Sequence, residues 1–150
     1  MLMFVIGVTW LDKEQRSNVN YFKYLGPEWK PKFTGHGIQV TNHQSWIDIL
    51  ICMFYYDSSF LAKSSVRYYP GIGKIAECIQ TVFINRADTK EKKAEYMKII
   101  QERQVQAETG EIPPIIIYPE GATTNGETMV YFNKGAFASL RGVQPIVISY

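Results

Sequence analysis

The spacing of apolar and polar residues along the chain predicts strands and helices in alternation. Short apolar runs between turn residues predict strands at 37–41, 59–63, 81–85, 113–118 and 145–149. Helical spacing is found at 45–56, 71–79, 89–107 and 134–140. The clearest helix, 89–107, ends before Gly110, and its expected apolar side is Tyr96, Met97, Ile99 and Ile100. Strands alternating with helices favour an α/β fold with a mostly parallel sheet flanked by helices.

The chain begins with an apolar run, MLMFVIGVTWL, at residues 1–11. This run is too short to cross a bilayer, and it lacks the basic flank and cleavage site of a signal peptide. Basic and aromatic residues, interleaved with acidic ones, follow it up to residue 32. This combination suits a membrane surface, but it equally suits a solvated connector of mixed charge. A core helix, an interfacial helix and the end of a longer membrane segment are all compatible with the run. We expect residues 1–32 to form a membrane-associated segment and connector.

Residues 33–150 are expected to form a core domain that is incomplete at its C-terminus, within a longer polypeptide. With 46% apolar and 20% charged residues, the chain has the composition of a globular protein. A net charge of +2 gives no argument for a nucleic-acid partner. Cys52 and Cys78 lie in apolar segments and are interpreted as small core residues in a reducing compartment. With two histidines, a metal site built on His and Cys has almost no ligands available.

Polar residues suited to catalysis follow three of the predicted strands. Asn42 and His43 follow the first strand, Arg86 follows the third, and Glu120 and Gly121 follow the fourth. In an open α/β sheet, ligands bind outside the carboxyl ends of the strands. We therefore expect a base, a cation and a carboxylate to meet at one edge of the sheet.

His43 and Asp48 are separated by four residues in the segment NHQSWID, across a predicted strand-to-helix turn. An imidazole can act as a general base near neutral pH. A carboxylate bound to its other nitrogen would orient it and stabilise its protonated form. Ser45 and Asp48 also fit a capping box, with Ser45 as the N-cap of the helix. Both interpretations can hold together, since a helix N-terminus favours a negative charge.

Two further segments also have ordinary structural explanations. Arg86, in TVFINR, suits a phosphate group, but it can equally form an ion pair with Asp88 or Glu120. The loop YPEGATTNG follows a buried strand, and its Asn125-Gly126 dipeptide is a strong turn signal. The residues themselves leave these alternatives open.

These segments resemble the motifs of the glycerolipid acyltransferases. NHQSWID, TVFINR, YPEGATTNG and VQPIVI occur in the order and spacing of that family and cover residues 42–148. The third motif, followed by FNKGAF, is most similar to the lysophospholipid acyltransferases, which remodel phosphatidylcholine or phosphatidylethanolamine. Two residues depart from the family pattern: Ala122 stands where Thr is usual, and Gln80 stands near a position that is often Gly.

The resemblance implies transfer of a fatty acyl group from acyl-CoA to the glycerol hydroxyl of a lysophospholipid. His43 would be the general base, and Asp48 would orient it. Substrate binding would involve Arg86, at the acceptor phosphate, together with Glu120, Gly121, Thr123 and Pro145. The resemblance implies no metal and no cofactor, with acyl-CoA as a co-substrate. It also implies an intracellular, membrane-associated protein of the endoplasmic reticulum or the mitochondrial membrane.

Two other functions are compatible with the sequence. A catalytically silent acyltransferase-like subunit of a larger membrane complex is one, although a scaffold has no need of His43 and Asp48. A hydrolase that activates water against a thioester is the other, although Arg86 would then have no function. CoA release with and without a lysophospholipid would separate these functions.

Overall fold

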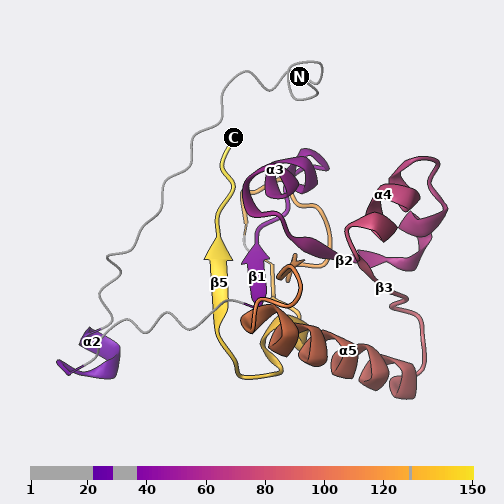
Figure 1. The fold of residues 1–150 in the computed structure, drawn as a ribbon. Helices are drawn as coiled ribbons and strands as arrows, with labels where there is room; N and C mark the ends of the chain where they lie inside the picture. Colours follow the sequence, from indigo (N-terminus) through magenta and orange to yellow (C-terminus); the bar gives the residue numbers. More distant parts are fainter. Residues whose placement is uncertain (1–21, 29–36, 129) are drawn as a thin grey trace. The chain divides into compact units, whose positions relative to one another are not determined.

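The computed structural model describes residues 22–28, 37–128 and 130–150 (Figure 1). The chain divides into two units, residues 1–32 and 33–150, and each is considered by itself. In the first unit, the described part contains a short helix, α2 (Phe22–Leu25), on which Tyr24 is exposed. The apolar run at 1–11 lies outside the described residues, so its membrane role stays a prediction. In the described parts of the chain, no helix is long and apolar enough to span a bilayer.

The second unit alternates strands with helices, which confirms the predicted α/β class. Its strands are β1 (Ile38–Thr41), β2 (Ser59–Lys63), β3 (Val82–Ile84), β4 (Ile115–Ile117) and β5 (Val143–Ile146). Its helices are α3 (Ile47–Tyr56), α4 (Ile72–Cys78) and α5 (Lys90–Glu108), with two 3₁₀ helices, η1 (Ser64–Tyr68) and η2 (Lys134–Phe137). The sequence pattern does not predict η1. It also extends η2 too far and places β5 too late in the chain.

The strands form one five-stranded sheet in the order β3-β2-β4-β1-β5. Each neighbouring pair is parallel, and β1 lies between β4 and β5 through the registers Ile38–Ile115 and Ile38–Val143. Figure 1 shows β1 and β5 side by side, pointing in the same direction. In a parallel sheet the carboxyl ends of all strands lie at the same edge. The residues that follow β1, β3, β4 and β5 therefore share one edge, as the sequence pattern predicts for the first three.

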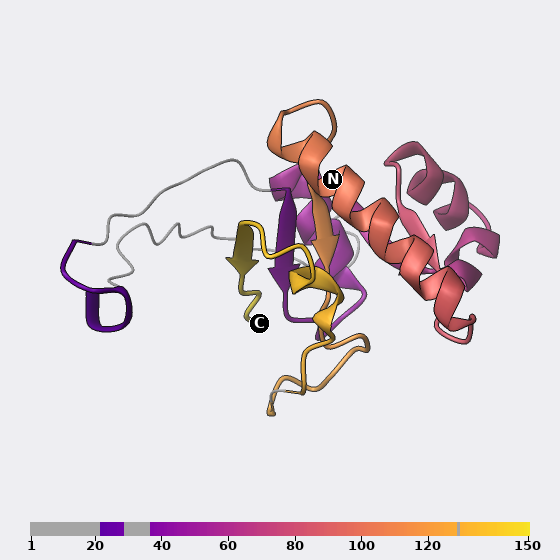
Figure 2. The same ribbon diagram turned by 90° about the horizontal axis from the view of Figure 1, so that it is seen from below.

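Helices cover both faces of the sheet. Alternate residues of β1 and β4 point to opposite faces. One face carries buried isoleucine and valine side chains that form a hydrophobic cluster with Ile100 of α5. Figure 2 shows α5 running along this side of the strands. On the opposite face, the hydroxyl of Tyr118 lies 4.0 Å from Sγ of Cys52, which is a buried residue of α3.

Two expectations about the core are wrong. Ile99 is exposed because α5 meets the sheet along a narrow stripe that contains Met97, Ile100 and Gln104. Cys78 is also exposed, whereas Cys52 is fully buried. A helix that contacts the core on one side leaves apolar residues on its other side in solvent.

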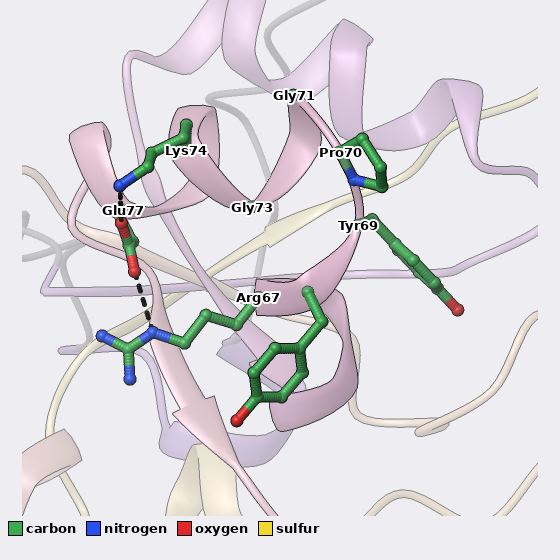
Figure 3. Close-up of a pocket in the computed structure, with 8 residues that line it drawn as sticks. Arg67, Tyr69, Pro70, Gly71, Gly73, Lys74 and Glu77 are labelled. Carbon is green, nitrogen blue, oxygen red and sulfur yellow. Dashed lines mark hydrogen bonds and ion pairs between the residues drawn. The ribbon is translucent and has the colours of Figure 1, made fainter.

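A pocket of about 380 Å³ lies at η1 and α4, away from the residues expected to form the site (Figure 3). Glu77 in its wall accepts a hydrogen bond from Nε of Arg67 at 2.8 Å and lies 3.5 Å from Nζ of Lys74. Arg67 and Lys74, two cations in the wall of this pocket, are therefore both paired with Glu77.

Candidate active site

His43 and Asp48 are in direct contact at the carboxyl end of β1. Nδ1 of His43 lies 2.8 Å from Oδ2 of Asp48. Asp48 is fully buried in the first turn of α3, whereas 18% of the His43 side chain is exposed. A buried carboxylate needs donors, so the hydrogen on Nδ1 is assigned to this bond, and Nε2 is left as the basic nitrogen. Among the residues that the structure describes, none forms a hydrogen bond to Nε2.

Four donors surround the Asp48 carboxylate. Oδ2 accepts from His43 and from the backbone N–H groups of Gln44, at 2.7 Å, and Ser45, at 3.0 Å. Oδ1 accepts from the hydroxyl of Tyr150. Burial raises the pKa of Asp48, but these hydrogen bonds, led by that of His43, outweigh burial and hold the pKa below its ordinary value. Asp48 therefore carries the charge that would stabilise a protonated His43.

The predicted capping box is formed only in part. Trp46, not Ser45, occupies the N-cap position of α3. Oγ of Ser45 accepts a hydrogen bond from the N–H of Ile47 at 3.3 Å. It therefore does not accept from the N–H of Asp48, as a capping box requires. The Asp48 carboxylate nevertheless bonds back to the N–H of Ser45, which is the second half of a capping box. One carboxylate thus serves both the start of the helix and the imidazole.

Tyr118, which follows β4, stacks on the imidazole ring of His43. The two ring centroids are 4.0 Å apart, and the ring planes differ by 26°. Burial raises the pKa of the Tyr118 hydroxyl, which therefore stays protonated. The stack on one side and the Asp48 bond at Nδ1 together fix both the position and the rotation of the imidazole.

Glu120 joins the loop after β4 to the loop after β1. Its Oε1 accepts from the backbone N–H of His43 at 3.3 Å, and its Oε2 accepts from the hydroxyl of Thr124 at 3.1 Å. The N–H of Thr124 in turn donates to the carbonyl of His43 at 2.8 Å. These bonds hold the backbone of His43 in place from the second loop. A role of Glu120 in binding the acceptor head stays a prediction.

The guanidinium of Arg86 lies beside Gly121. A Cβ added at Gly121 would lie 3.4 and 3.5 Å from the two terminal nitrogens of Arg86, and 2.7 Å from Nδ2 of Asn133. Gly121 has a φ of +77°, which a glycine adopts without strain. Among the described residues, neither Asp88 nor Glu120 forms an ion pair with Arg86, so the ordinary ion pair is not formed. An exposed cation is thus left at the edge of the site.

Thr123 and Pro145 are less closely tied to His43. Thr123 is exposed, and no described residue forms a hydrogen bond with its side chain. Pro145 lies within the edge strand β5, paired with Val40, where a missing N–H group is tolerated. Its position is inside the strand and not beyond the carboxyl end, so its expected influence on the acyl or CoA side stays a prediction.

Sequence reasoning missed Tyr118, Tyr150 and the structural role of Asn42. The side-chain amide of Asn42 exchanges two hydrogen bonds of 2.8 Å with the backbone N–H and carbonyl of Ile148. This clip fixes the segment after β5 against the end of β1 and brings Tyr150 to Asp48. A signal was present, since both tyrosines follow the carboxyl ends of parallel strands.

Comparison with known proteins identifies lipid acyltransferases. Residues 7–149 match the family model described as Acyltransferase. Lysophospholipid acyltransferase LPEAT1 of Arabidopsis thaliana is 29% identical over 162 residues, which cover 100% of this chain and 41% of the relative. Lyso-ornithine lipid O-acyltransferase of Pseudomonas aeruginosa is 36% identical over 115 residues, covering 74% of this chain and 42% of the relative. Lysophosphatidylcholine acyltransferase 2 of Homo sapiens is 29% identical over 108 residues, which cover 72% of this chain and 19% of the relative.

No solved structure shows a significant match to the chain. The chain spans less than half the length of each of the three relatives described above. The family match nevertheless extends over almost all of its residues and includes the loops that carry His43, Asp48, Arg86 and Glu120. The chain belongs to the acyltransferase family, with similarity to its lysophospholipid acyltransferases.

Proposed function

We propose that this chain carries the active site of an acyl-CoA-dependent lysophospholipid acyltransferase. The observation that carries the proposal is the 2.8 Å contact between Nδ1 of His43 and the fully buried carboxylate of Asp48. This arrangement leaves Nε2 free to act as a base. The relatives, whose names include lysophospholipid and lysophosphatidylcholine acyltransferases, support the choice of acceptor.

In the proposed reaction, Nε2 of His43 takes the proton of the free glycerol hydroxyl. The resulting oxygen nucleophile attacks the thioester carbonyl of acyl-CoA, and an ester bond forms as the bond to sulfur breaks. The CoA thiolate leaves and receives the proton from the imidazolium. Asp48 favours this cycle because its charge stabilises the imidazolium and its position fixes the tautomer. The products are a diacyl phospholipid and CoA.

Arg86 supplies the group that would bind the acceptor phosphate. Its guanidinium is exposed beside Gly121, and no described residue neutralises it. A planar guanidinium can bind two phosphate oxygens at once, which a lysine cannot. Gly121, Glu120, Thr123 and Pro145 are proposed to shape the surrounding substrate cleft.

The test is CoA release with and without an acceptor. The full chain is given oleoyl-CoA, with or without lysophosphatidylcholine or lysophosphatidylethanolamine, and the phospholipid product is followed by mass spectrometry. We expect acceptor-dependent release, and a loss of roughly a hundredfold to ten-thousandfold in His43→Ala, as is typical when a general base is removed. His36→Ala, which substitutes the other histidine in the same way, serves as the matched control.

The outcomes separate the alternatives. Equal CoA release without acceptor would indicate a thioester hydrolase. No release from folded protein with either acceptor would favour a catalytically silent subunit. Unchanged release by a folded His43→Ala variant would contradict the proposed role of His43.

We further propose that residues 1–32 bind the membrane surface from which the substrates are drawn. The apolar run at 1–11, followed by basic and aromatic residues, supports this. Deletion of residues 1–11 is expected to weaken co-sedimentation with phosphatidylcholine–phosphatidylserine vesicles. Equal sedimentation of both chains would contradict it. The endoplasmic reticulum, the mitochondrial membrane and a subunit role in a membrane complex stay predictions.

A further inference from the structure

We infer that Tyr150 is a positioning residue that acts on His43 through Asp48, an inference that rests on the proposed function. The hydroxyl of Tyr150 donates to Oδ1 of Asp48. Oδ2 of the same carboxylate already has three donors, namely His43 and the N–H groups of Gln44 and Ser45. Among the described residues, Tyr150 is the one whose side chain donates a hydrogen bond to Oδ1. One tyrosine therefore satisfies the side of the carboxylate that faces away from the imidazole.

The fold places Tyr150 there by a specific connection. Asn42 precedes His43 directly, and its amide holds the backbone of Ile148 through two hydrogen bonds of 2.8 Å. Tyr150 follows two residues later, so the same clip that fixes the end of β1 fixes the approach of this hydroxyl. The segment after β1 thus contacts Oδ2 of Asp48 through His43, and the segment after β5 contacts Oδ1 through Tyr150.

The contact joins the hydroxyl of Tyr150 to the carboxylate of Asp48, which is fully buried. The favourable part of the interaction is thus the charge-assisted hydrogen bond, which is stronger than a bond between neutral groups.

The bond has two consequences for the imidazole. A donor at Oδ1 holds the plane of the carboxylate, so that Oδ2 stays directed at Nδ1 of His43. It also stabilises the ionised form, since the hydrogen bond from Tyr150 lowers the pKa of Asp48. Burial and the neighbouring Asp48 raise the pKa of Tyr150, so the hydroxyl stays protonated and remains a donor.

The test is Tyr150→Phe, which removes the hydroxyl and keeps the ring. We expect kcat to fall roughly tenfold, in line with the loss of one hydrogen bond to a charged group, with little change in KM for either substrate. The acidic limb of the pH profile of kcat should move to higher pH, because Asp48 loses a bond that favours its ionised form.

Two controls separate positioning from a structural effect. Tyr68→Phe removes the hydroxyl of another exposed tyrosine, on η1, and should leave kcat and the pH profile unchanged. In an Asp48→Asn background, Tyr150→Phe should cost less than in the wild-type chain, since no carboxylate is left to orient. Thermal unfolding of each variant shows whether it is folded.

A fall in kcat without movement of the acidic limb would overturn the inference, and so would equal losses in the two backgrounds. Wild-type kinetics in Tyr150→Phe would overturn it too. These results differ from failure of the proposed function, which would appear as unchanged activity in His43→Ala. If Tyr150→Phe does not fold, Tyr150→Leu also lacks a donor at this position, and the same readouts apply.

Discussion

The guanidinium of Arg86 lies beside Gly121, although the two residues follow strands that are not neighbours in the sheet. Arg86 follows β3, Gly121 follows β4, and β2 lies between these strands. Glu120, the residue before Gly121, accepts a hydrogen bond from the backbone of His43. A cation from the edge of the sheet is thereby placed next to the loop that holds the imidazole.

The first prediction concerns the contact itself. Gly121→Ala should destabilise the fold by about 1–2 kcal/mol, the usual cost of a left-handed backbone in a residue with a Cβ. The new methyl group would also lie 2.7 Å from Nδ2 of Asn133 and 3.4 Å from Arg86. We therefore expect the KM for the lysophospholipid to rise as Arg86 is displaced. Urea unfolding and steady-state kinetics measure the two effects.

Gly110→Ala is the matched control for this substitution. Gly110 has a φ of +80°, but nothing lies within 4 Å of an added Cβ. It should show the backbone strain without the contact with Arg86, and KM should not change. Equal losses of stability with no effect on KM in either variant would show that the contact at Gly121 is unimportant.

The second prediction concerns the charge and shape of Arg86. Arg86→Lys keeps the charge but loses the two-pronged geometry that suits a phosphate. We expect the KM for the lysophospholipid to rise several-fold, and more than that for acyl-CoA. Arg67→Lys, in the pocket of Figure 3, changes an arginine that is bound to Glu77 and should affect neither value. An effect confined to acyl-CoA would assign Arg86 to the donor side.

The sequence predicts the elements of this fold better than their arrangement. Apolar periodicity overlaps all five strands and is most accurate for β1 and β4, whose residues are all buried. The residues at which each strand begins and ends are less predictable. The run at 113–118 is trimmed to Ile115–Ile117, since Pro113 and Pro114 cannot donate to a ladder. The order β3-β2-β4-β1-β5 depends on which strands pack together, and that information is not local.

A similar limit applies at Gln80, which stands near a position that is often Gly in the family. The chain turns there with a φ of +59°, which explains the preference for glycine. Here the left-handed residue is held by Arg103, whose NH2 group donates to Oε1 of Gln80 at 3.2 Å. Because this partner lies in α5, no local pattern around Gln80 predicts it.

The sequence predicts which strand ends carry the candidate site. It places His43, Arg86 and Glu120 at one edge of the sheet, because each follows a predicted parallel strand. Tyr150 was missed although it obeys the same rule, since a tyrosine after a strand is also a common surface residue. Its contact with Asp48 depends on the clip between Asn42 and Ile148, which only the folded chain reveals.

The third prediction distinguishes the two free cysteines. Burial raises the pKa of Cys52 to about 11, whereas Cys78 is exposed. The thiolate is the reactive form of cysteine, so iodoacetamide at pH 7 should label Cys78 and spare Cys52 in the folded chain. Peptide mapping by mass spectrometry measures both sites, and labelling in urea should reach both. Equal labelling of the two cysteines in the native protein would contradict the buried position of Cys52.

The fourth prediction concerns the pH dependence of stability. Burial disfavours the ionised Asp48, but hydrogen bonds led by that of His43 lower its pKa below the ordinary value of 3.8. Since the pKa is lower in the folded state than in the unfolded state, the ionised carboxylate stabilises the fold. This stabilisation is present in full above the unfolded pKa, and it is lost as the pH falls through the pKa of the folded state.

The free energy of unfolding in urea should therefore fall more steeply for the wild-type chain than for Asp48→Asn as the solution is acidified from neutral pH to below pH 3.8. The variant should be less stable at neutral pH, because an amide cannot accept all the hydrogen bonds that the carboxylate accepts. The two curves should approach each other in acid, where Asp48 is protonated. Asp57→Asn, which removes an exposed carboxylate at the end of α3, controls for net charge. Parallel curves for the wild-type chain and Asp48→Asn over the whole range would show that Asp48 is not ionised in the folded protein, and His43 would then lack the fixed charge on which its role as a base depends.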